Sequence, residues 1–173
     1  MFLSTEHRRF LLHEQAIGGG VFNTGLNALI AWALFPASDT IPLEGEPSIA
    51  GDTIATCFLL PFLICVIVTP LVRKAMAQGK VMPLPWSTTD HPLLRWLPRN
   101  TWARAALIGL VCALFVAPIA IGLLHMLGVE AMARTPFIVG KALFAGALAA
   151  VISPVVALYT LASPQPGVAK QTA

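Results

Sequence analysis

The stretch GGGVFNTGLNALIAWALF, residues 18–35, decides the fold class of this chain. It lies within a longer run, residues 15–36, that contains no Asp, Glu, Lys or Arg. About 20 such residues are enough for a helix to cross the hydrocarbon core of a bilayer. Asn23 and Asn27 nevertheless fall near the middle, where hydrocarbon offers an amide no hydrogen-bond partner. The stretch therefore predicts a membrane span with one polar face.

Three further windows have the same character, and Lys141 is the only charged residue in them. Hydrophobic residues make up 57% of the 173-residue chain and charged residues 11%, whereas a soluble domain carries roughly 25% charged residues. Buried helices of a soluble protein are the alternative, but so few charges cannot cover a water-facing surface around four apolar segments. We therefore predict an all-α integral membrane protein, a four-helix transmembrane bundle, with spans at about 15–36, 53–72, 105–124 and 137–162.

The basic residues predict the orientation of these spans. Nine of the eleven Lys and Arg residues fall in the N-terminal segment, the loop 73–104 and the C-terminal tail, while Arg134 and Lys141 lie at the other ends of the spans. By the positive-inside rule we expect a multi-pass protein of the plasma (inner) membrane with both termini in the cytoplasm. A cleaved signal peptide is the alternative for the first span, but its apolar core would be only about 7–15 residues long.

The segments outside the spans complete the predicted organisation. Residues 1–14 mix apolar and charged side chains, which indicates a short amphipathic helix at the inner interface, either separate from the first span or continuous with it. The chain then divides into this interfacial segment, a membrane domain over 15–162 with the cytoplasmic loop 73–104, and a polar tail over 163–173. The pI near 9.0 reflects the basic residues that flank the spans. Since the chain shows no nucleic-acid-binding signature, no nucleic-acid partner is expected.

The two asparagines share a helix face with small residues. Gly19, Asn23, Asn27 and Ala31 recur at every fourth position of the first span, and Thr24 lies beside them. The third and fourth spans carry similar stripes of small residues, which allow a second helix to approach closely. The stripes are Ala105, Gly109, Ala113 and Ala117 in the third span, and Ala142, Gly146, Ala150 and Pro154 in the fourth. We expect the asparagine face to pack against one of these two stripes.

Asn23, Thr24 and Asn27 are therefore the candidate polar site within the membrane. Three roles are open for them: hydrogen bonds between packed helices, a site for a solute, or a seam between copies of the chain. We favour the first role, because two neutral amides mark a transport path less strongly than two charges would.

Charged residues at the span ends form the second candidate site. Asp52 opens the second span and Lys141 lies one turn inside the fourth, so the two side chains reach a similar depth at the outer edge. They form either an ion pair or two independent side chains that extend to the headgroups, and we favour the independent arrangement. Glu14 and Arg104 flank the inner face in the same way.

The sequence contains no recognisable catalytic chemistry. The three cysteines lie inside spans, no histidine lies in mid-span, and we find no phosphate-binding loop, nucleophile motif or zinc motif. We therefore expect no enzyme activity, metal or cofactor. The best hypothesis is an accessory, assembly or scaffold subunit that lies in the lipid bilayer with another membrane protein or with copies of itself. The alternative is a small oligomeric transporter whose polar stripe lies on the first span.

Overall fold

The computed structural model describes residues 3–35, 40–90 and 94–163. The chain is mostly helical (78%). Among the described residues, four helices are long and apolar enough to cross a membrane: Thr5–Leu34, Ile49–Ala77, Thr101–Met126 and Arg134–Ala162. The first comprises α1 (Thr5–Arg9), a π-helical segment (Phe10–Gly18) and α2 (Gly19–Leu34), and the others are α3, α4 and α5. The short strands β1 (Thr40–Pro42) and β2 (Ala131–Ala133) pair antiparallel.

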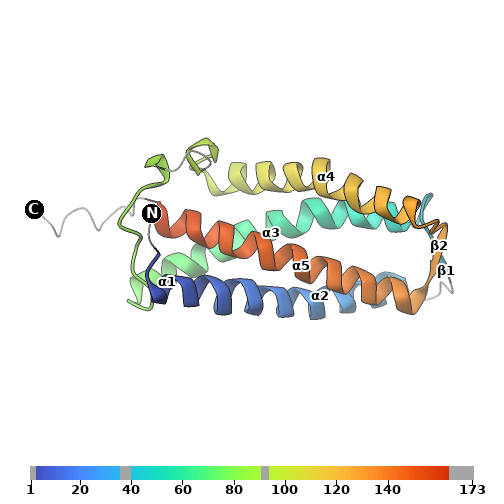
Figure 1. Cartoon of the computed structure of the whole chain (residues 1–173), viewed down its shortest axis with the longest axis horizontal. Coiled ribbons are helices and arrows are strands. Elements are labelled where there is room, and N and C mark those ends of the chain that lie inside the picture. The colour runs from blue at the N-terminus through green and yellow to red at the C-terminus, as the bar shows by residue number, and fades with distance from the viewer. Residues whose placement is uncertain (1–2, 36–39, 91–93, 164–173) are drawn as a thin grey trace, which may run out of the picture.

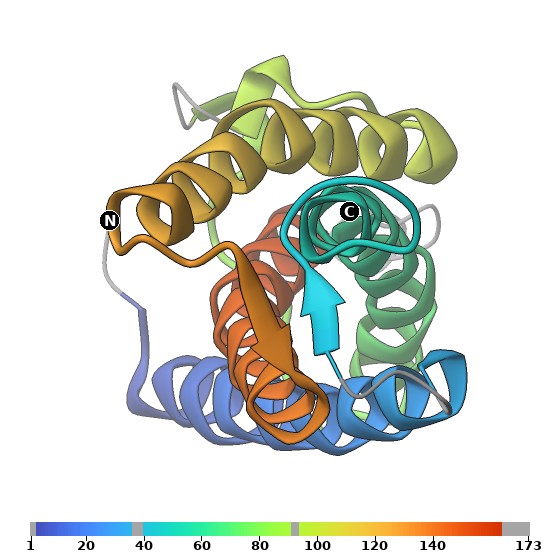
Figure 2. The same cartoon turned by 90° about the vertical axis from the view of Figure 1, so that its right-hand side faces the viewer.

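The four long helices lie side by side, with α3 and α5 at the centre (Figure 1). α2 packs against α5, α4 packs against α3, and α3 packs against α5. Figure 2 looks onto the end that carries the two strands, which we call the hairpin end. The opposite end, where α1 begins and α5 finishes, we call the basic end. Its exposed basic residues, among those described, are Arg8, Arg9, Arg73, Lys74, Lys80, Arg95 and Arg99.

Two helices begin four residues before the apolar windows that predicted them, because polar caps start them. The side chain of Ser48 accepts a hydrogen bond from the backbone N–H of Gly51 at 3.1 Å, so α3 already contains Asp52 in its first turn. The side-chain oxygen of Asn100 accepts from the backbone N–H groups of Trp102 (2.8 Å) and Ala103 (3.2 Å) at the start of α4. Such caps satisfy the free N–H groups of a first helical turn.

The N-terminal segment continues directly into the first apolar helix. Phe10 and Leu11 are buried in a cluster with residues of α3, the following loop and α5. His7 is also buried, and its ring hydrogen-bonds to the carbonyl oxygen of Met82 at 2.8 Å. The boundary expected near residue 14 is therefore not a break in the helix. Of the expected tail 163–173, only Ser163 is described.

Arg104 is buried (1% exposed), which corrects the expectation that its side chain extends to the headgroups at the inner face. The loop before α4 folds over it. The Arg104 guanidinium donates hydrogen bonds to the carbonyl oxygen of Pro98 at 3.2 Å and to the hydroxyl of Thr69 at 3.1 Å. The guanidinium carbon also lies 4.3 Å from the ring centre of Tyr159. Arg104 thus joins α3, α4, α5 and the loop at the basic end.

Replacing Arg104 with lysine should lower the free energy of unfolding by about 2 kcal/mol. The compact ammonium of lysine cannot make all the hydrogen bonds and the ring contact that the planar guanidinium makes. The measurement is the thermal or denaturant unfolding of the purified chain in detergent. The exposed residue Arg99 provides the matched control, since its own replacement by lysine should change stability by less than about 0.5 kcal/mol. Equal effects at the two positions would contradict a structural role for the Arg104 side chain.

Candidate functional site: the groove between α2 and α3

The face of α2 that carries the asparagines packs, through its glycines, against the small residues of α5. A Cβ atom added at Gly20 would lie 3.2 Å from both the carbonyl oxygen of Gly146 and the Cβ of Ala150, and one added at Gly19 would lie 2.9 Å from the Ser153 hydroxyl. The hydroxyl of Thr24 lies directly over Gly146. The asparagine face therefore lies against the stripe of the fourth span. Gly109, in the stripe of the third span, packs instead against Phe58 of α3.

The amides of Asn23 and Asn27 are buried (8% and 7% exposed), but they do not join α2 to another helix. The Asn23 amide nitrogen donates to the carbonyl oxygen of Gly19 at 2.8 Å, and that of Asn27 donates to the carbonyl oxygen of Asn23 at 3.0 Å. The hydroxyl of Thr24 likewise donates to Gly20 within the same helix. In the part of the chain that the structure describes, the two amide oxygens accept no hydrogen bond. Two good acceptors thus remain unused.

These two amides line a groove of about 550 Å³ between α2 and α3, which we call the α2–α3 groove. Its walls are two rows of apolar side chains, each repeating at every fourth residue and each substantially exposed. The rows are Phe22, Leu26, Ile30 and Leu34 on α2, and Leu59, Leu63, Ile67 and Leu71 on α3. Lys141 and Ser153 of α5 also line the groove. The α2–α3 groove is therefore mainly apolar, with polar atoms at intervals along its length.

The groove is as long as a membrane span. On the α3 side its lining extends from Asp52 to Leu71, all within one α-helix. At a rise of 1.5 Å per residue this corresponds to about 30 Å, the thickness of the hydrocarbon core of a bilayer.

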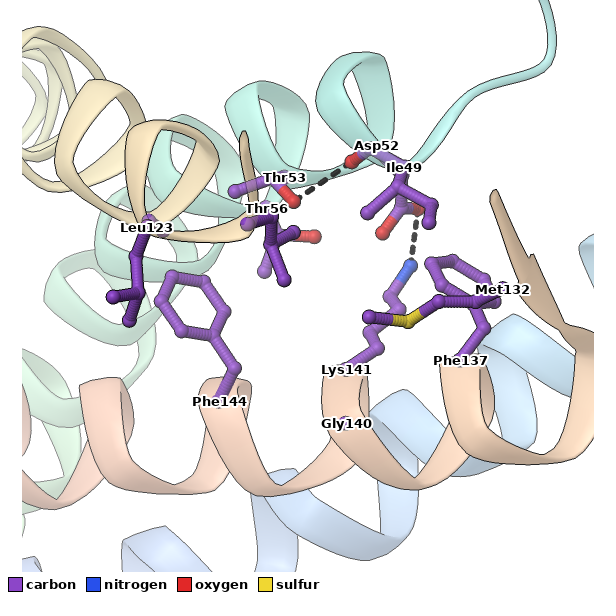
Figure 3. Close-up of a pocket in the computed structure, with 12 residues that line it drawn as sticks. Ile49, Asp52, Thr53, Thr56, Leu123, Met132, Phe137, Gly140, Lys141 and Phe144 are labelled. Carbon is purple, nitrogen blue, oxygen red and sulfur yellow. Dashed lines mark hydrogen bonds and ion pairs between the residues drawn. The ribbon is translucent and has the colours of Figure 1, made fainter. Parts of the chain in front are cut away.

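Asp52 and Lys141 form an ion pair between α3 and α5, in contrast to the independent arrangement that we favoured from the sequence. The Lys141 ammonium contacts an Asp52 carboxylate oxygen, and both side chains are largely buried (6% exposed for Lys141 and 12% for Asp52). Figure 3 shows Lys141 extending from α5 toward Asp52 in the first turn of α3. α3 and α5 both start at the hairpin end, so Asp52 and Lys141 lie at the same depth. Because both charges are largely buried, each is stabilised mainly by the other.

The structure adds two polar residues that sequence reasoning missed. Thr56 and Ser153 are buried, line the α2–α3 groove, and make no side-chain hydrogen bond among the described residues. Thr56 lies one turn after Asp52, and this spacing was a signal that could have placed it on the same face. Ser153 directly precedes Pro154, a position that does not by itself indicate exposure to a groove.

A second cavity, of about 220 Å³, lies near the hairpin end between α3, α4 and α5 (Figure 3). We call it the hairpin-end cavity. Asp52, Thr56 and Lys141 line both this cavity and the α2–α3 groove. The ion pair and Thr56 therefore stand where the two spaces approach each other.

Comparison with protein-family models, curated proteins and solved structures finds no match to this chain. Among the described residues, no group of three or more His, Cys, Asp or Glu side chains is arranged to hold a metal ion. The α2–α3 groove is therefore the candidate functional site.

Proposed function

We propose that this chain is an accessory subunit of the plasma (inner) membrane that holds one transmembrane helix of a different protein in the α2–α3 groove. Both termini lie in the cytoplasm, because the basic end carries most of the Lys and Arg residues. The proposal rests on one observation: a groove as long as a membrane span is lined by two largely buried asparagines whose amide oxygens accept no hydrogen bond among the described residues.

The length and the amides favour a helix over a lipid as the occupant. The acyl chain of a lipid reaches through only one leaflet, about half of the hydrocarbon core, whereas the groove extends over about 30 Å. An acyl chain also has no hydrogen-bond donor for the oxygens of Asn23 and Asn27, and a buried amide without a partner costs about 1–3 kcal/mol in proteins. A helix that carries donor side chains one turn apart can donate to both amide oxygens, and its ridges fit between two rows of residues spaced four apart.

The exposed faces of this chain favour a different protein over a second copy. Within residues 19–34, 53–72, 105–124 and 137–162, every side chain in the exposed class is apolar except Trp32, whose indole N–H is a hydrogen-bond donor near the hairpin end of α2. The outer face of α4, with Leu114, Phe115 and Ile119, is the most accessible face for a neighbouring copy. It offers no hydrogen-bond donor to Asn23 or Asn27. The exposed donor Trp32 lies near the end of its span, whereas Asn23 and Asn27 lie in the middle, so we expect the donor on a different transmembrane helix.

A photo-crosslinking residue at Leu63, on the wall of the groove, tests this proposal in the native membrane. We expect one protein to be crosslinked at fixed stoichiometry, with the adduct located in a transmembrane segment that contains Ser, Thr, Asn or Gln. The same crosslinker at Leu114, on the outer face of α4, is the matched control and should give mainly lipid adducts.

The double variant Asn23→Ala/Asn27→Ala sharpens the test. Its thermal stability in detergent should change little, because both amides donate only to their own helix, but the adduct at Leu63 should be lost. Three outcomes would contradict the proposal: lipid adducts alone at Leu63, the same protein adduct at Leu114, or an adduct that survives the double substitution. An adduct with a second copy of this chain would favour the oligomeric transporter instead.

A further inference from the structure

The hairpin-end cavity combines an apolar wall with a polar edge. The wall consists of side chains from α4, β2 and α5, namely Leu123, Leu124, Met132, Phe137 and Phe144. Figure 3 labels most of these side chains around the space. The polar edge is formed by Asp52, Thr56 and Lys141. The shape is that of a site for a molecule with an apolar body and one polar group.

The polar edge retains unused hydrogen-bonding capacity. The hydroxyl of Thr56 makes no hydrogen bond within the described part of the chain, although the residue is only 8% exposed. The Lys141 ammonium uses one of its three N–H groups on Asp52, and the second carboxylate oxygen of Asp52 accepts no hydrogen bond from a described residue. Thr53, by contrast, already donates to the carbonyl oxygen of Ile49 at 2.7 Å. The edge can therefore both donate and accept.

The charges at this edge sum to zero, which selects the kind of polar group that fits. A charged head group would compete with one member of the buried pair and leave the other uncompensated, at a cost of several kcal/mol. An uncharged hydroxyl or amide can donate to Asp52 or Thr56 and accept from Lys141 without separating the pair.

The volume limits the size of the apolar body. A cavity of about 150 Å³ lined by apolar side chains accommodates benzene, so about 220 Å³ accommodates a substituted ring or a short branched chain. We infer that the hairpin-end cavity binds a small uncharged amphiphile, a ring or short chain with one hydroxyl or amide group that hydrogen-bonds at Asp52, Thr56 and Lys141. The apolar body of this ligand lies on the α4 side, outside the α2–α3 groove, although its three polar partners line both spaces.

Phenol and toluene, which differ by a hydroxyl in place of a methyl group, are suitable probes. The melting temperature of the purified full chain in detergent is measured at equal mole fractions of each probe in the micelle. A ligand that binds only the folded state raises the melting temperature in proportion to its occupancy. We expect phenol to raise it by several degrees more than toluene does.

Two substitutions in the cavity and one outside it show whether the probes raise the melting temperature by binding in the hairpin-end cavity. Thr56→Val keeps the shape of the side chain but removes the hydroxyl, and should abolish most of the difference between phenol and toluene. Ala120→Leu, on the α4 side, reduces the space and should weaken both effects. Asn27→Ala, in the α2–α3 groove, should leave the phenol effect unchanged. Equal shifts by the two probes in the unmodified chain would overturn the inference, as would an undiminished phenol effect in the Ala120→Leu variant.

Discussion

Replacing Gly146 with leucine is expected to destabilise the chain by about 3 kcal/mol or more, and to leave little folded protein after extraction in detergent. A Cβ atom at this position would collide with the Thr24 hydroxyl and lie 3.1 Å from the carbonyl oxygen of Gly20. The second contact is with backbone, so no change of rotamer relieves it. The whole of α2 would have to move away from α5, and the contact that fixes one wall of the α2–α3 groove would be lost.

Gly140 provides the control for this prediction, because it lies on the same helix and no atom lies within 4 Å of the position that its Cβ would occupy. Gly140→Leu should therefore give nearly normal yield and melting temperature. The smaller change Gly146→Ala should cost less than leucine, and adding Thr24→Ala should recover part of the loss because it removes the colliding hydroxyl. If Gly146→Leu and Gly140→Leu have the same effect, the close approach of α2 and α5 is wrong.

The number and approximate position of the long helices follow from hydropathy alone, because a run of about 20 apolar residues, in a chain with so few charges, is typical of a membrane-spanning helix. The helix ends were predicted less well. The windows were defined by the absence of charge, whereas Ser48 and Asn100 start the helices one turn earlier through hydrogen bonds to backbone N–H groups. A search for capping residues would have found both.

The choice of packing partner could not be made from the sequence. Gly109 and Gly146 lie in stripes of equal quality, and only the arrangement of all four helices decides that α2 packs against the second of them. The directions of the amides were also beyond sequence reasoning. An asparagine in a helix can bond to a carbonyl one turn earlier or to a neighbouring helix, and Asn23 and Asn27 take the local option.

Arg104 shows a different limit of sequence reasoning. Its place at the end of a span predicted a side chain that extends to the lipid headgroups, as basic residues at such positions commonly do. The loop that precedes α4 covers it instead and supplies the carbonyl oxygen of Pro98 as a partner. The conformation of a proline-rich loop depends on what it packs against, so this contact left no periodic signal in the sequence.

Replacing Lys141 with methionine is expected to cost about 3–5 kcal/mol, because it leaves the carboxylate of Asp52 without its partner in a largely buried position. The contact between Glu44 and His125 is the matched control. Its side chains are far more exposed, at 75% and 49%, so Glu44→Gln should cost less than about 1 kcal/mol. Both values come from unfolding of the purified chain in detergent.

The double variant Asp52→Leu/Lys141→Met distinguishes the net contribution of the ion pair to stability from the penalty of leaving one buried charge unpaired. When both charges are removed, the desolvation penalty disappears together with the attraction, so stability should return to within about 1 kcal/mol of the original chain or exceed it. The phenol advantage at the hairpin-end cavity should nevertheless fall in the double variant, since only Thr56 would remain to bind a hydroxyl. A double variant as unstable as the single one would mean that the two side chains do not face each other. Recovery of stability together with loss of the phenol advantage would show that the pair is retained for recognition rather than for stability.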